Sequence, residues 1–177
     1  GVIIIGLAIW QLLPKDQALP VPEDKQGIAV ISFENQTGDA AFDHLRKVIP
    51  NLLITNLERS GYFRVTTWDR MYDLLRQLGK EDREYIDRGL GFELCRMEGV
   101  DTIILGTFGK AADVFVTDVK VLDVETKNLI RSVSSSGEGE ASILKTQIDE
   151  LSREIIKGIG LPETDLESRR INITAAT

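Results

Sequence analysis

The first folded part of the chain constrains the fold most, because a buried strand, an amphipathic helix and a second strand follow one another closely. Residues 27–33 (GIAVISF) form a short, continuous apolar run between polar residues, which is typical of a strand buried on both faces. Apolar side chains then recur at helical spacing over residues 42–59. Residues 62–67 (YFRVTT) alternate and are rich in aromatic and β-branched types. This order predicts a right-handed crossover and a parallel strand pair.

Three local signals refine that opening. Pro50 lies inside the apolar stripe and has no amide hydrogen, so we expect a kink or a fresh helix start there. Gly61 follows the stripe and is the expected left-handed C-cap. Residues 34–39 (ENQTGD) are polar and predict a loop between the first strand and the helix.

The rest of the sequence continues in the same manner. Helices are expected over residues 69–78 and 88–98, and strands over 102–108, 114–124 and 129–136, with hairpin connections at 109–111 and 125–128. A last helix over residues 143–159 is expected to bury one side, formed by Ile143, Leu144, Ile148, Leu151, Ile155, Ile156 and Ile159. The order β-α-β-α-α-β-β-β-α predicts an α/β fold of the mixed α+β kind, with a mixed sheet of about five strands packed by helices.

The segments outside this domain differ in character. Residues 1–13 (GVIIIGLAIWQLL) hold Gln11 as the only polar side chain. At about 1.5 Å per residue they span roughly 20 Å, so we interpret them as the end of a transmembrane helix whose beginning is missing. A buried helix or strand of the domain is the alternative. Residues 14–26 predict a proline-punctuated linker, 27–162 the domain, and 163–177 a tail leading to a downstream region.

Composition excludes several classes of function. The chain has 21 Lys and Arg against 28 Asp and Glu, so its formal charge of −7 argues against a nucleic-acid partner. Cys95 is the only cysteine and His44 the only histidine, which excludes an internal disulfide and a Cys/His zinc cluster. We therefore expect no metal and no cofactor.

Signals for catalysis are equally sparse. The sequence contains no GxSxG, GxxxxGK[ST] or HExxH motif. A hydrolase that uses His44 with Asp43 or Glu34 stays open as an alternative, although adjacent helical side chains point about 100° apart. Cys95 lies in an apolar helical stretch and is expected to be a small core residue. The sequence therefore predicts a protein that is not an enzyme, with no catalytic residue.

The polar loop after the first strand is the one candidate site. Ligands of open α/β sheets bind beyond the carboxyl ends of strands, but the carboxylates clustered here would repel phosphate and match no EF-hand. A structural role is expected, with a positive φ at the loop glycine, side-chain hydrogen bonds closing the turn, and a carboxylate capping the next helix. The candidate functional or structural loop consists of Glu34, Asn35, Thr37, Gly38 and Asp39.

The same segment carries a family resemblance. Residues 28–39 (IAVISFENQTGD) resemble the opening of TolB amino-terminal-like domains, an opening shared with curli-secretion (CsgG-like) and FlgO-like proteins. Three later segments resemble the family in the same order: 57–65 (LERSGYFRV), 99–106 (GVDTIILG) and 119–126 (VKVLDVET). One departure is the last hairpin, where Lys127 and Asn128 replace the family's glycine, and Asn128 tolerates a left-handed backbone.

The resemblance implies a non-catalytic mixed α/β module outside the cytoplasm. It also implies a bacterial envelope or signalling protein, held at the membrane by its N-terminal helix, whose domain acts in protein interaction or sensing. Protein partners are expected, and tetratricopeptide repeats can follow such modules. A curli-type (CsgG-like) secretion or envelope-assembly component is a further alternative.

Overall fold

The computed structural model describes residues 25–160. The predicted membrane helix at residues 1–13, most of the predicted linker and the predicted tail lie outside this range. Within it, no helix is both long and apolar enough to cross a membrane.

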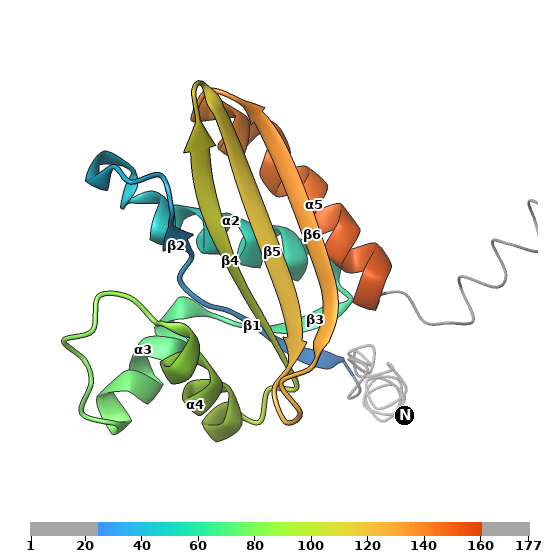
Figure 1. Ribbon diagram of the computed structural model, residues 1–177. Helices are drawn as coiled ribbons and strands as arrows, with labels where there is room; N and C mark the ends of the chain where they lie inside the picture. Colours follow the sequence, from blue (N-terminus) through green and yellow to red (C-terminus); the bar gives the residue numbers. More distant parts are fainter. Residues whose placement is uncertain (1–24, 161–177) are drawn as a thin grey trace, which may run out of the picture.

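A six-stranded mixed sheet forms the centre of the domain, which confirms the predicted fold class (Figure 1). Its main path runs β3-β1-β4-β5-β6, and a short β2 also pairs with β4. β1 is parallel to β3 and β4, whereas β4, β5 and β6 are antiparallel neighbours. The strands are β1 Gln26–Val30, β2 Glu34–Asn35, β3 Phe63–Thr66, β4 Thr102–Ala111, β5 Val114–Asp123 and β6 Leu129–Glu138.

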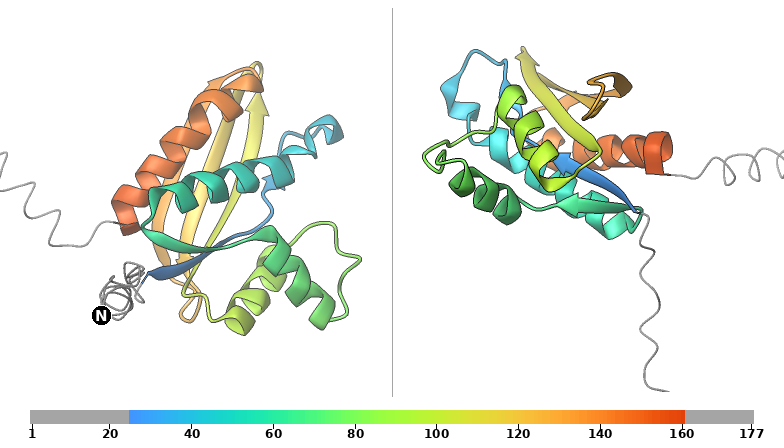
Figure 2. Two further views of the ribbon diagram at one scale, coloured as in Figure 1. Left: turned by 180° about the vertical axis from the view of Figure 1, so that it is seen from behind. Right: turned by 90° about the horizontal axis from the view of Figure 1, so that it is seen from below.

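Helices cover the two faces of the sheet unequally. The last helix consists of three consecutive segments: the π-helical η2, then α5, then the π-helical η3. α2 and α5 lie on one face, while α3 and α4 lie on the other face at one end only (Figure 2). The helices are η1 Ala40–Phe42, α2 Leu45–Ser60, α3 Trp68–Gln77, α4 Arg88–Glu98, η2 Ile143–Gln147, α5 Ile148–Ile155 and η3 Ile156–Gly160.

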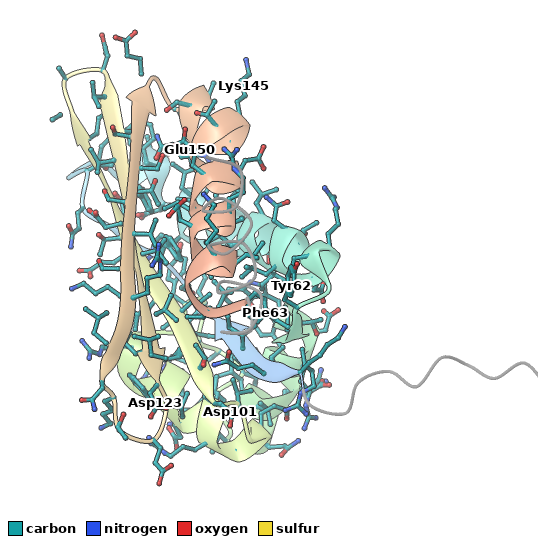
Figure 3. The ribbon with its side chains drawn as sticks, turned by 90° about the vertical axis from the view of Figure 1, so that its right-hand side faces the viewer. Tyr62, Phe63, Asp101, Asp123, Lys145 and Glu150 are labelled. Atoms are coloured by element: carbon teal, nitrogen blue, oxygen red, sulfur yellow. The ribbon has the colours of Figure 1, made fainter. Side chains whose placement is uncertain are left out.

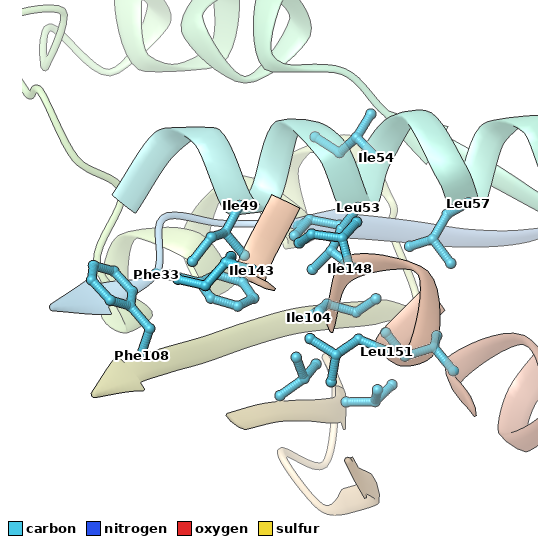
Figure 4. Close-up of a cluster of buried hydrophobic side chains, with 14 of the residues drawn as sticks. Phe33, Ile49, Leu53, Ile54, Leu57, Ile104, Phe108, Ile143, Ile148 and Leu151 are labelled. Carbon is cyan, nitrogen blue, oxygen red and sulfur yellow. The ribbon is translucent and has the colours of Figure 1, made fainter. Parts of the chain in front are cut away.

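Two apolar cores follow from the alternation of side chains along β1 and the residue after it, Ile31. Ile28 and Val30 face α2 and α5, whereas Ala29 and Ile31 face α3 and α4. Figure 4 shows the first core, in which Leu53 of α2 lies close to Ile104 of β4 and to the last helix. β1 is therefore buried on both faces, as its continuous apolar sequence predicts.

The first strand and helix differ from the prediction in detail. The predicted loop at 34–39 begins with a short strand, because Glu34 and Asn35 pair with β4. The helix does not restart at Pro50, because α2 begins at Leu45 and continues to Ser60; of the predicted kink or fresh start, the fresh start is wrong. Gly61 has a φ of 76° and caps α2 in the left-handed conformation, as predicted.

The hairpins and the last helix also correct the prediction. The connection expected at residues 109–111 lies inside β4, because cross-strand pairing continues to Ala111 and the turn is formed by residues 112–113. In the second hairpin the positive φ, 60°, belongs to Lys127 and not to Asn128. Leu144 is 47% exposed, because the wider π-helical turn of η2 places Gln147 on the buried side.

Candidate functional site

The loop after the first strand is closed by side-chain hydrogen bonds. The Asn35 side-chain oxygen accepts from the backbone amide of Thr37 at 2.9 Å and from its hydroxyl at 2.7 Å. The Asn35 amide group donates to the Asp39 carbonyl at 2.9 Å and to the Asp43 carboxylate at 2.8 Å. Asn35 therefore connects the start of the loop to its end and to the turn before α2.

The remaining loop residues set the backbone path. Gly38 has a φ of +78°, a conformation that glycine adopts without strain. Asp39 caps η1, since its carboxylate accepts from the amide of Ala41 at 2.9 Å. Among residues 25–160, no group of three or more His, Cys, Asp or Glu side chains is arranged to hold a metal ion.

Beside this loop lies a pocket with a volume of about 800 Å³, which we call the open-face pocket. Its lining comes from the segment leading into α4 and from β4, β5 and β6. Within residues 25–160, α2 and α5 lie on the other face of these three strands (Figures 1 and 2). Of the predicted site residues, Glu34 alone lines it. Its charged lining residues are Glu34, Arg46, Asp87, Arg88, Asp118 and Lys120, and its uncharged lining residues include Ile31, Ile86, Leu105, Thr107 and Ser132.

Five of the six charged side chains were absent from the sequence prediction. They come from α2, α4 with its N-cap, and β5, so no short motif contains them. None of the six forms an ion pair with any residue in the described range. Asp87 caps α4 by accepting from the amide of Leu90 at 3.0 Å.

Arg46 has the most unusual environment in the open-face pocket. Its guanidinium carbon lies 3.6 Å from the centroid of the Tyr85 ring, a stacking contact that fixes the plane of the group. Its Nε atom is buried and has no hydrogen-bond partner within residues 25–160. Buried polar groups are normally hydrogen-bonded, so this donor is an exception.

His44 is not part of this pocket. Its Nδ1 lies 3.0 Å from the Ala41 carbonyl oxygen, and its Nε2 lies 2.9 Å from the Glu140 carboxylate. Asp43 accepts from Asn35 instead, so the structure does not form the hydrogen-bonded pair that the hydrolase alternative requires. The histidine therefore links the start of α2 to the segment before the last helix.

Cys95 is a core residue, as predicted. Its side chain is fully buried in α4, within the core that contains Leu94 and Ile103. Burial raises the pKa of the thiol to about 12, which disfavours the nucleophilic thiolate.

A second exposed feature is the edge strand β6. Its ten residues pair with β5 on one side, and no other strand of the described range pairs with its second side. Ser132, Ser134 and Ser136 are exposed along it. Figure 3 shows α5 lying along β6, where Ser135 donates to the carboxylate of Glu150.

Comparison with known proteins supports the resemblance at the level of the fold. No family model matches the chain, and no curated protein matches it. The lipoprotein GNA1162 from Neisseria meningitidis is 15% identical over 75% of this chain and 97% of its own, with a TM-score of 0.53. The LpoB C-terminal domain from Escherichia coli is 16% identical over 75% of this chain and 93% of its own, with a TM-score of 0.50.

TolB from Acinetobacter baumannii is also similar. It is 16% identical over 80% of this chain, with a TM-score of 0.51. This chain covers 30% of the TolB chain. The domain therefore shares its fold with part of TolB, with the LpoB C-terminal domain and with the lipoprotein GNA1162, and identities this low show the fold alone.

Proposed function

We propose that the described domain is a non-catalytic protein-interaction or sensory module, tethered to the membrane and placed outside the cytoplasm. The observation that carries the proposal is the fold, which the chain shares with part of TolB, with the LpoB C-terminal domain and with the lipoprotein GNA1162. The TolB-like sequence segments imply the same class of module. The apolar run at residues 1–13 supplies the tether.

The roles of the reactive side chains support a non-catalytic module. Asp39 caps η1, His44 bonds Glu140 and Cys95 is buried, so each of these groups has a structural role. A hydrolase that depends on His44 would lose activity in His44→Ala. We expect the folded His44→Ala protein to keep whatever binding activity the parent protein shows.

The β6 edge supports an interaction role. An edge strand presents unpaired backbone amides and carbonyls, which an extended segment of a partner protein can pair with. β6 contains no proline, and only Arg131 and Glu138 carry charge along it. The partner class that fits is therefore a protein that offers an extended segment.

The location can be tested with reporter fusions in a bacterial host. In a protein that carries the complete predicted membrane helix, alkaline phosphatase joined after Gly160 should be active, and β-galactosidase joined there should be inactive. That protein should sediment with membranes, whereas a chain lacking the helix through residue 13 should stay soluble with an almost unchanged melting temperature. Active β-galactosidase would contradict the proposed location, and a loss of several kcal/mol on deletion would make residues 1–13 a core element.

The interaction can be tested with a photo-crosslinking amino acid placed at single positions of the full chain. Ser134 is exposed on β6, and Asn51, exposed on α2 across the sheet, is the matched control. We expect one discrete protein adduct from position 134 and none from position 51. The same adducts from both positions would argue against β6 as the interaction surface.

A further inference from the structure

We propose that the open-face pocket binds a short peptide through its free amino end and its free carboxylate. The inference deepens the sensory part of the proposed function by naming a ligand class. The peptide proposal depends on residues of α2, α4 and β5. It is separate from the β6 edge, which contributes only Ser132 to the pocket.

Arg46 provides the first argument. A guanidinium offers five hydrogen-bond donors in a fork that matches a carboxylate. In this pocket the group is stacked on Tyr85, its Nε is buried without a partner, and it forms no ion pair with any residue of the described range. The buried Nε is out of reach of a ligand, but the terminal guanidinium nitrogens are not among the buried donors, so a ligand carboxylate in the pocket could accept hydrogen bonds from them.

The orientation of Arg46 is also fixed before a ligand arrives. Its backbone carbonyl accepts from the amide of Phe33 at 3.0 Å, which holds this turn of α2 against the segment between β1 and β2. The Tyr85 ring holds the other end of the side chain. Preorganisation of this kind reduces the entropy lost on binding.

The other charges of the pocket exclude a simple anion as the preferred ligand. Arg46, Arg88 and Lys120 supply three positive charges, and Glu34, Asp87 and Asp118 supply three negative charges, so the formal sum is zero. The carboxylates would repel a free phosphate or sulfate, whereas they would attract an ammonium group. A ligand that carries both charges is complementary to this lining.

The size and the uncharged lining select a peptide among zwitterionic ligands. A volume of about 800 Å³ lies toward the upper end of the range typical of small-molecule sites and exceeds what one free amino acid fills. Ile31, Ile86 and Leu105 form an apolar part of the wall, which suits an aliphatic side chain. Thr107 and Ser132 offer hydroxyl groups to the amides of a peptide backbone.

The test is calorimetric titration of the full chain, purified in detergent, with the tripeptide alanyl-leucyl-alanine. We expect saturable binding that weakens at least tenfold when the tripeptide is acetylated at its amino end, and equally when it is amidated at its carboxyl end. Arg46→Gln should weaken binding at least tenfold. Arg83→Gln is the matched control, because Arg83 is exposed nearby and does not line the pocket, and it should bind like the parent protein.

Lys120→Gln provides a second variant, since Lys120 is exposed on β5 and its replacement leaves the core intact. It should also weaken binding, and a thermal melt should confirm that each variant is folded. Absence of binding at millimolar tripeptide, equal binding of the blocked forms, or competition by inorganic phosphate at the same concentration would overturn the proposal. The reporter and crosslinking results are independent of this titration, so failure of the pocket proposal is distinguishable from failure of the proposed function.

Discussion

The backbone amide of Phe33 donates a hydrogen bond to the carbonyl oxygen of Arg46, with a nitrogen–oxygen distance of 3.0 Å. In a regular helix that carbonyl would accept from the residue four positions later, which here is Pro50 and has no amide hydrogen. The Arg46 carbonyl is therefore free to accept from Phe33, which lies in the segment that follows β1. Pro50 therefore allows the strand to be tied to the helix, and the same bond holds Arg46 at the open-face pocket.

Close packing at Phe33 leads to the first prediction. A Cβ added at Gly106 of β4 would lie 2.5 Å from the Asp118 carbonyl oxygen and 2.5 Å from the Phe33 ring. Gly106→Ala should therefore lower the free energy of unfolding by at least about 2 kcal/mol, because the β4–β5 ladder or the ring must move. Chemical denaturation followed by circular dichroism measures the change.

Gly109→Ala is the control for this prediction, since Gly109 lies on the same strand and a Cβ there would meet no atom within 4 Å. It should change stability by no more than about 0.5 kcal/mol. Equal losses of stability in Gly106→Ala and Gly109→Ala would show that the close contacts at Gly106 do not cause the loss.

The ion pair between α3 and α4 predicts a pH dependence. Arg70 donates to the Glu98 carboxylate at 2.8 Å through Nε, and this hydrogen bond lowers the pKa of Glu98 below its ordinary value of 4.5. The pair therefore contributes stability above the unfolded-state pKa, and the contribution is lost as pH falls through the lower folded-state pKa. Urea unfolding between pH 7 and pH 3 should show a smaller acid loss for Glu98→Gln than for the parent protein.

Glu81→Gln serves as the control, because Glu81 is exposed and forms no ion pair within the described range. Its pH profile should follow that of the parent protein. If the free energy of unfolding depended on pH in the same way for the parent, Glu81→Gln and Glu98→Gln, the Arg70–Glu98 ion pair would not contribute to acid stability.

The second β-hairpin contains a correctable strain. Lys127 has a φ of 60°, which costs a residue with a side chain roughly 1 kcal/mol relative to glycine. Lys127→Gly should therefore raise the free energy of unfolding by up to about 1 kcal/mol. Asn128→Gly, one residue later, should bring no gain. A larger gain in stability from Asn128→Gly would mean that Asn128, and not Lys127, is the left-handed residue of this turn.

The sequence predicts the fold well because the fold depends on local patterns. The apolar run of β1, the stripe of α2 and the cap at Gly61 each signal their element within a few residues, and the structure contains all three. The errors arise where long-range pairing decides the outcome. Residues 109–111 look like a turn, but hydrogen bonding to β5 extends β4 through them. Leu144 looks buried, but a π-helical turn exposes it.

The open-face pocket is less predictable for the same reason. Glu34 and Arg46 are twelve positions apart, and Asp118 and Lys120 reach the pocket only because β5 pairs beside β4. No spacing rule joins residues that meet through sheet topology. The loop at residues 35–39 shows the converse. Most of its hydrogen bonds join residues two to four positions apart, and Asn, Thr and Asp are the residue types that form such turns.

The buried thiol gives a chemical prediction. Cys95 is fully buried and the pKa of its thiol is raised to about 12, so the native protein should react with a disulfide reagent such as DTNB only through unfolding. The reaction rate should rise by orders of magnitude in denaturant, where the thiol is exposed. Rapid labelling of the native protein at pH 8 would contradict the buried placement.

The loop at residues 34–39 yields the last prediction. Asp39 accepts from the Ala41 amide at the start of η1, so Asp39→Ala should lower the free energy of unfolding by about 1 kcal/mol. Asp39→Asn keeps an acceptor oxygen and should cost less. Gly38→Val should lower the free energy of unfolding more than Asp39→Ala, because a β-branched residue is strained at a φ of +78°.

A calcium site in this loop would show the opposite pattern, since removing one of several carboxylates would relieve repulsion and leave stability unchanged or higher. Thermal melts with and without calcium separate the two roles: a midpoint that calcium raises in the parent protein but not in Asp39→Ala would establish a ligand site.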